Sequence, residues 1–173
     1  PVRGPAYDLT ALVTEDDLPH HVQLVWHGVH DEANLPQFLG SRVHWAECDV
    51  RRDPLGRLVL RHDSFERTPW SRSEKGLELG DLLAQLREQG RGVKLDLKEG
   101  DAILDDVLAA VDAHGFDDAD LWFNARIEAL GEDGVGRLVA AHPDAIVQCP
   151  VDFLAPLVLA APERAWDTIK LLM

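Results

Sequence analysis

The chain has 173 residues, of which 46% are hydrophobic, and its formal net charge is −14, from 31 acidic and 17 basic residues. This length and apolar content suit one globular domain, residues 1–173, whose core needs no disulfide or structural metal. An acidic chain without a lysine or arginine cluster repels phosphate backbones and anionic membranes, so we predict no nucleic-acid partner. An anionic substrate would need a local positive site, most simply a metal ion.

The sequence shows no recognisable targeting signal, and its two cysteines give little information about the compartment. No apolar stretch approaches the roughly 18 residues that span a bilayer, and no basic and apolar leader opens the sequence. We therefore expect no transmembrane segment and leave the compartment open, with a soluble cytoplasmic protein slightly favoured. Cys48 and Cys149 lie inside apolar runs, which indicates buried free thiols.

Short β-rich runs alternate with helical patterns along the chain. This alternation predicts an α/β fold around a parallel sheet, either an open doubly wound sheet or a (β/α) TIM-type barrel. Predicted strands lie at 21–27, 43–50, 58–62, 92–98, 120–126 and 145–151, with a seventh candidate at 155–162. Predicted helices lie at 32–41, 78–89, 101–114, 132–141 and 163–172.

The second and third runs are too close for a parallel connection. About seven residues separate them, whereas a parallel crossover needs about a dozen, so we predict an antiparallel hairpin. The sequence DPLG supplies the turn, with Gly56 able to take positive φ. The hairpin brings His62 near Glu47 and Asp49. A two-residue loop would set His62 opposite Glu47, and a type I turn with a bulge at Gly56 would set it opposite Cys48.

Polar side chains gather where the predicted strands end, which is the edge where α/β barrels and open parallel sheets build their sites. Carboxylates are hard oxygen ligands for Mg²⁺ or Ca²⁺, two histidines can divide general base and general acid, and a lysine can hold a phosphoryl oxygen. Together these groups suit metal-assisted cleavage of a phosphodiester. They are His27, Glu47, Asp49, His62, Lys94, Asp96, Lys98 and Asn124.

Five motifs, in this order and spacing, carry a family resemblance: VWHGVHD, WAECDV, LRHD, GVKLDLK and LWFNARI. They resemble the menorin-like family, a branch of the phospholipase-C-like phosphodiesterase barrels that also include glycerophosphodiesterases and sphingomyelinase D enzymes. The resemblance covers roughly residues 22–155. It implies a TIM-type barrel with a divalent metal and a pair of catalytic histidines.

Residue roles follow from the resemblance position by position. His27 and His62 match the catalytic histidines of the family. Glu47 and Asp49 match its metal-binding acidic pair, and Asp96 matches a third metal ligand. Lys98 matches a substrate-phosphate lysine, and we add Lys94 and Asn124 as substrate-binding candidates. The hypothesis is a divalent-metal-dependent phosphodiesterase for a small or lipid-like phosphodiester, in which one histidine acts as nucleophile or base and the other as acid. The alternatives are a non-catalytic binding module that keeps the metal-site residues, and hydrolysis of a different ester on the same scaffold.

Each candidate also has a structural interpretation. Glu47 and Asp49 can belong to a solvated strand face, Asp96 and Lys98 can form an internal ion pair, and Asn124 can satisfy backbone at a strand end. If the acidic pair is buried, repulsion predicts raised carboxylate pKa values without metal. We interpret the remaining histidines as surface or capping residues: His20, His21, His30, His44, His114 and His142.

The length of the chain bears on the barrel. A (β/α) barrel usually takes about 250 residues, so six strands and a seventh candidate predict a barrel that is short or incomplete at its C-terminal side. A truncated chain, a minimal barrel and a barrel completed by another chain all fit this pattern. Exposed strand edges favour association with another chain, so a homo-oligomer is a possible partner state that we expect.

Overall fold

The computed structural model describes residues 18–71, 76–150, 155–160, 163–164, 167 and 170. Its centre is a parallel sheet in the order β1-β2-β4-β5-β6, and β3 pairs antiparallel with β2. This arrangement confirms the predicted α/β class and all six predicted strands. The strands are β1 (Val25–Trp26), β2 (Trp45–Arg52), β3 (Leu58–Leu60), β4 (Gly92–Leu97), β5 (Leu121–Asn124) and β6 (Ile146–Gln148).

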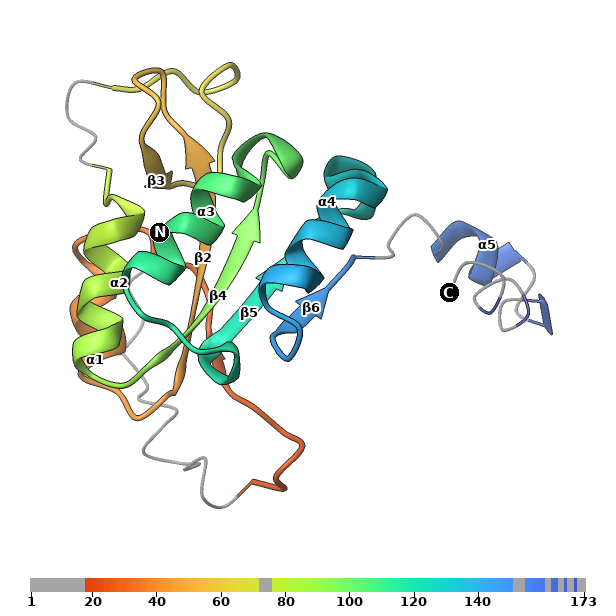
Figure 1. The fold of residues 1–173 in the computed structure, drawn as a ribbon, viewed down its shortest axis with the longest axis horizontal. Coiled ribbons are helices and arrows are strands. Elements are labelled where there is room, and N and C mark those ends of the chain that lie inside the picture. The colour runs from red at the N-terminus through yellow and green to blue at the C-terminus, as the bar shows by residue number, and fades with distance from the viewer. Residues whose placement is uncertain are drawn as a thin grey trace, which may run out of the picture.

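Helices α2, α3 and α4 cover one face of the sheet (Figure 1). Four of the predicted helices are confirmed. The predicted helix at 132–141 is the part of α4 that follows a break at Gly131, whose φ of 67° and ψ of 172° are not helical. The predicted helix at 163–172 lies mostly outside the described residues. The helices are α1 (Asn34–Leu39), α2 (Leu79–Glu88), α3 (Asp101–Ala113), α4 (Ile127–Ala141) and α5 (Ala155–Ala160), with a 3-10 turn η3 (Asp118–Asp120) before β5.

The seventh strand candidate is wrong, because residues 155–160 form helix α5. A short apolar run can belong to a strand or to a buried helix, and periodicity alone does not separate them. The sequence APLVLA contains alanine and leucine, which favour helix. Among the described residues no strand joins β1 to β6, so the sheet is open, as expected of a short or incomplete barrel.

The core lies between the sheet and the helices. Successive strand side chains point to opposite faces, so alternate residues of β2, β4 and β5 pack under the helices. Cys48, Leu95 and Phe123 are fully buried there, together with Leu83 of α2 and Val107 of α3. The intervening residues of each strand belong to the other face, which we call the polar face. On it the strand register pairs Glu47 with Lys94, Asp49 with Asp96, and Asp96 with Asn124.

The hairpin of β2 and β3 has the bulged form. Gly56 has a φ of 86°, the left-handed conformation that a type I turn followed by a bulge requires. Arg61 N–H donates to the Asp49 carbonyl at 2.8 Å, which continues the register one residue beyond the strand pairs. This register sets His62 opposite Cys48, so the bulged alternative is confirmed.

Two smaller predictions also have an outcome. No helix in the described part of the chain is both long and apolar enough to cross a bilayer. Both cysteines are free thiols; Cys48 is buried as predicted, whereas Cys149 is only half-buried. Burial and the nearby carboxylates of Glu47, Asp49 and Asp96 raise the pKa of the Cys48 thiol well above its usual value, so this thiol is not a nucleophile.

Candidate active site

Three carboxylates meet on the polar face at the end of the sheet where the parallel strands finish. Glu47, Asp49 and Asp96 each offer an oxygen, and these oxygens all lie within 4.8 Å of one another. The parallel register of β2 and β4 produces the cluster, because it sets Asp49 directly beside Asp96. Glu47 is 4% exposed and Asp49 is 1% exposed. Buried carboxylates this close together need cations or hydrogen-bond donors around them.

Lys98 supplies one such cation. Its Nζ lies 2.7 Å from Asp49 Oδ1 and 2.6 Å from Asp96 Oδ2. Lys98 follows β4 directly, and its backbone N–H donates to the Val50 carbonyl, so the strand register carries the side chain to the cluster. Burial would lower the pKa of Lys98, but the two carboxylates raise it. The ammonium is therefore charged at neutral pH, and the ion-pair interpretation of Asp96 and Lys98 describes a real contact.

His30 contacts the other oxygen of Asp49, which the sequence did not predict. Its Nε2 lies 2.7 Å from Asp49 Oδ2 and accepts the Asp49 backbone N–H at 3.0 Å. The prediction of His30 as a surface or capping residue is therefore wrong. The available signal was its position in the loop after β1, three residues beyond His27 and directed toward the same strand ends.

The pKa of Asp49 runs opposite to our expectation. Burial alone would raise it, but the contacts with His30 and Lys98 hold the pKa of this carboxyl well below its ordinary value. The predicted rise considered only the repulsion between carboxylates, whereas the neighbouring His30 imidazole and Lys98 ammonium outweigh both this repulsion and burial here. Asp49 is consequently ionised at neutral pH.

The loop after β1 closes over Glu47. Gly28 has a φ of 81°, and its N–H donates to Glu47 Oε2 at 2.8 Å. The Val29 N–H donates to the Glu47 carbonyl at 2.9 Å, which holds the loop against β2. This geometry sets His27 Nε2 3.6 Å from Glu47 Oε2, with 81% of the His27 side chain exposed. His27 therefore borders the acidic cluster and faces solvent.

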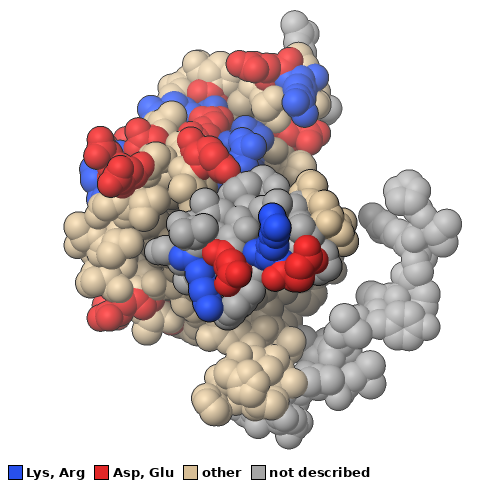
Figure 2. All heavy atoms as spheres, turned by 90° about the vertical axis from the view of Figure 1, so that its right-hand side faces the viewer, with Lys and Arg blue, Asp and Glu red and all other residues tan. Residues whose placement is uncertain are grey.

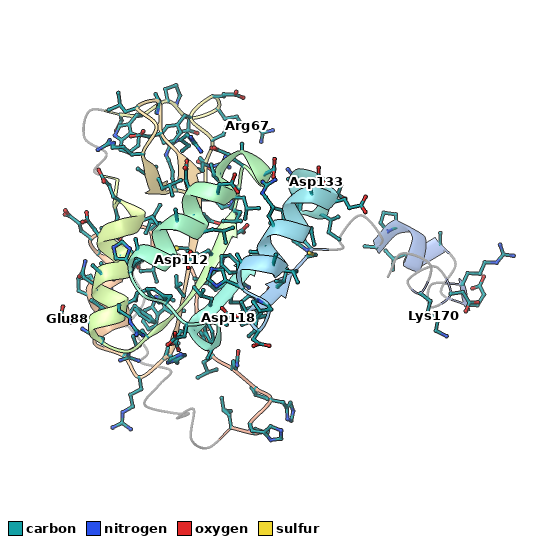
Figure 3. All side chains as sticks on the ribbon, in the orientation of Figure 1. Arg67, Glu88, Asp112, Asp118, Asp133 and Lys170 are labelled. Atoms are coloured by element: carbon teal, nitrogen blue, oxygen red, sulfur yellow. The ribbon has the colours of Figure 1, made fainter. Side chains whose placement is uncertain are left out.

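His62 lines a pocket together with His30. The pocket has a volume of about 570 Å³ and is bordered by the chain after β3 and by the loop after β1. Arg67, labelled in Figure 3, belongs to that chain after β3. His62 is largely exposed, and its Nδ1 lies 3.1 Å from Asp63 Oδ1. Among the described residues, His30 and not His27 lines this pocket together with His62.

The two substrate-binding candidates on neighbouring strands differ in position. Asn124 ends β5 beside Asp96, and its Oδ1 is buried without a hydrogen-bond partner among the described residues. Lys94 lies further from the strand ends, and its Nζ is 4.5 Å from the centre of the Trp122 ring. Lys94 thus makes a cation–π contact, whereas Lys98 contacts the carboxylates.

The donor set fits a divalent cation. Three carboxylates within reach of one point are the hard oxygen ligands that Mg²⁺ and Ca²⁺ prefer. In the described part of the chain, Asp49 Oδ2 and Asn124 Oδ1 are buried at the same strand ends without a hydrogen-bond donor. The imidazole nitrogen of His30 does not fill this role for Asp49, because it already accepts the Asp49 amide. Oxygens of this kind are suited to bind a cation or its water shell.

His142 and two aspartates form a contact at the opposite end of the sheet, and this contact has a structural role. His142 caps the end of α4, and its Nδ1 lies 2.8 Å from Asp118 Oδ1 and its Nε2 3.6 Å from Asp112 Oδ1. Figure 3 labels Asp118 in η3 and Asp112 near the end of α3. His142 therefore links these segments, as a capping residue that is buried and not on the surface.

Known structures resemble this architecture, although neither a protein-family model nor a curated protein matches the sequence. One is a glycerophosphodiester phosphodiesterase from Agrobacterium tumefaciens, 22% identical with a TM-score of 0.50 over 66% of this chain and 57% of that chain. Another is a putative glycerophosphodiester phosphodiesterase from Galdieria sulphuraria, 15% identical with a TM-score of 0.54 over 83% of this chain and 81% of that chain.

The chain has the fold of the glycerophosphodiester phosphodiesterases. At 22% and 15% identity these neighbours show the fold, and the resemblance that the motifs indicate is confirmed at this level. The chain spans a little over half the length of the Agrobacterium protein.

Proposed function

We propose that this chain is a divalent-metal-dependent hydrolase of the phosphodiesterase type, acting on a small or lipid-like phosphodiester. The observation that carries the proposal is the buried cluster of Glu47, Asp49 and Asp96, with Lys98 among them, at the strand ends of a phosphodiesterase-like sheet. In barrels of this architecture, active sites lie at that end of the strands. A carboxylate cluster beside a lysine suits a substrate that carries phosphoryl oxygens.

Each candidate has a chemical role in this proposal. Glu47, Asp49 and Asp96 would hold the metal, Mg²⁺ or Ca²⁺, which when bound supplies positive charge against a phosphoryl oxygen. Lys98 and Asn124 would orient the phosphoryl group, with Lys94 as a further substrate-binding candidate. The pocket of about 570 Å³ has room for the organic part of a diester.

The histidines would move the protons. Nδ1 of His62 faces Asp63, which leaves Nε2 to exchange a proton with substrate. Nε2 of His27 lies 3.6 Å from Glu47 Oε2, so its imidazole borders the acidic cluster. One histidine would take a proton from the attacking water while the other protonates the departing oxygen of the diester.

The test is release of p-nitrophenol from bis(p-nitrophenyl) phosphate with Mg²⁺, Mn²⁺ or Ca²⁺, and with EDTA. We expect metal-dependent turnover that falls by about 10²-fold or more in His27→Ala, His62→Ala and Glu47→Ala. His20→Ala is the matched control, because His20 is an exposed histidine outside the five motifs, and it should keep wild-type turnover. Turnover that survives both EDTA and Glu47→Ala would contradict a metal-dependent site.

The second candidate is a non-catalytic binding module that keeps the metal-site residues. One observation favours it, because His27 does not line the pocket that His62 borders. A protein that binds metal in calorimetry but releases no p-nitrophenol under any condition would support this candidate over the enzyme.

A further inference from the structure

The acidic cluster already holds a cation that belongs to the chain. The ammonium of Lys98 lies between two of the three carboxylates, 2.7 Å from Asp49 and 2.6 Å from Asp96. The other lysine of the polar face, Lys94, contacts the Trp122 ring instead. Lys98 is 21% exposed, so its charge is held largely away from water.

A divalent ion that took Asp49 Oδ1 and Asp96 Oδ2 as ligands would compete with this ammonium for the same oxygens. A metal bound to either oxygen at about 2.0–2.6 Å would stand no more than about 5 Å from Nζ, because Nζ lies equally close to those oxygens. At that separation two positive charges in a partly buried site repel strongly. The metal therefore gains its full set of carboxylates only when the ammonium withdraws.

Lys98 can withdraw without a change in the fold. It stands just beyond the last residue of β4, at the open end of the strands, and its charge sits on a flexible four-carbon stem. Its backbone N–H stays on the Val50 carbonyl whichever way the side chain points.

We propose that Lys98 is the resident cation of the metal-free cluster and gates the metal site, so that a divalent ion binds by displacing its ammonium. The displaced ammonium is then available to the anionic group of a substrate. This inference rests on the proposed function for the identity of that site and adds an order to it, with metal before substrate.

Isothermal titration calorimetry with Mn²⁺ alone tests the gate. We expect Lys98→Met to bind Mn²⁺ about tenfold more tightly than wild type or better, because one competing charge is removed. Lys98→Arg keeps the charge and should not gain affinity. Arg87→Met is the matched control, because Arg87 pairs with Asp120 at the other end of the sheet and its removal should leave Mn²⁺ affinity unchanged. Equal or weaker Mn²⁺ binding by Lys98→Met, including none at all, would overturn the proposal.

A second measurement uses the wild-type protein, so it does not depend on the folding of a variant. Reductive methylation followed by mass spectrometry reports how fast each lysine amine reacts. Saturating Mn²⁺ should speed methylation of Lys98 and leave that of Lys94 unchanged, because Mn²⁺ releases only the Lys98 ammonium from its carboxylates. A Lys98 rate that does not change when Mn²⁺ binds would count against displacement.

The outcomes separate this inference from the proposed function. If Lys98→Met binds Mn²⁺ more tightly and wild type releases no p-nitrophenol, the proposal that Lys98 gates the metal site is supported and the proposed phosphodiesterase function is contradicted. If wild type releases p-nitrophenol in a metal-dependent way and Lys98→Met gains no Mn²⁺ affinity, the phosphodiesterase function is supported and the gating role of Lys98 is contradicted.

Discussion

At the scale of single residues, Asp49 shows how a buried acid can be kept ionised. One oxygen contacts the ammonium of Lys98 and the other lies beside the imidazole of His30, and together they lower the pKa of the carboxyl although burial opposes it. His30 also accepts the Asp49 backbone N–H, so one imidazole orients both the main chain and the side chain of this residue. We interpret His30 as a positioning residue.

Replacement of His30 by alanine should therefore affect both stability and metal binding. The loss of a buried hydrogen-bond acceptor is expected to lower the free energy of unfolding by about 1–3 kcal/mol. Loss of a group that orients a metal ligand is expected to weaken Mn²⁺ binding by about 10–100-fold. Urea denaturation and calorimetry measure the two effects.

His44→Ala is the matched control for that experiment. His44 also pairs with an aspartate, since its Nε2 lies 3.2 Å from Asp120 Oδ1, but this pair lies at the other end of the sheet. Its removal should leave Mn²⁺ affinity unchanged. The positioning role would be refuted if His30→Ala and His44→Ala bound Mn²⁺ alike.

At the scale of elements, the hairpin depends on Asp53. Its Oδ1 accepts the N–H groups of Leu55 and Arg57, both at 2.9 Å, and its Oδ2 accepts Arg57 Nε at 2.8 Å. These bonds close the turn of the hairpin. The turn fixes the register of β2 with β3, and this register determines where His62 lies relative to Asp49. Burial would raise the pKa of Asp53, but the bonds from Arg57 and Leu55 lower it.

A carboxyl with a lowered folded-state pKa stabilises the fold above its unfolded pKa, here 3.8, and the contribution disappears as the pH falls through the folded-state value. Asp53→Asn should thus lower the free energy of unfolding by about 1–2 kcal/mol near neutral pH. The difference from wild type should shrink steadily below about pH 4. Thermal melts of both proteins across this range give the measurement, and a constant difference down to about pH 2 would show that the charge of Asp53 is not involved.

At the scale of the whole molecule, the described sheet has two free edges, at β1 and β6. All three residues of β6 are exposed, among them Ile146 and Val147. Acidic and basic side chains are interspersed on the face shown in Figure 2. The chain spans a little over half of the Agrobacterium protein, whose barrel fold it shares in part. An open apolar edge of this kind favours pairing with another chain.

We therefore expect the protein to self-associate through β6. In sedimentation velocity, the apparent mass of wild type should rise above 19.2 kDa with concentration. Val147→Lys places a charge on the edge strand and should keep the protein monomeric. Val139→Lys is the control, because Val139 is an exposed valine of α4 and lies away from the edge. A wild type that stays at the monomer mass at every concentration would contradict this expectation.

Local pattern was sufficient for much of this protein. The alternation of apolar runs and amphipathic segments predicted the parallel α/β sheet. The short gap before Leu58 allowed only an antiparallel hairpin, and the positions of Glu47, Asp49, Asp96 and Lys98 at strand ends predicted that they would meet. These inferences succeed because strand period, crossover length and strand direction depend on neighbouring residues.

Other features were decided by the tertiary structure alone. Which turn the hairpin used, the contact of His30 with Asp49, the ammonium of Lys98 between two carboxylates, and the helical state of residues 155–160 had no local signal strong enough to predict them. Each depends on the register between strands or on a loop that folds back across the sheet. A shift of one residue would move every side chain to the other face, so only the assembled sheet determines which groups meet.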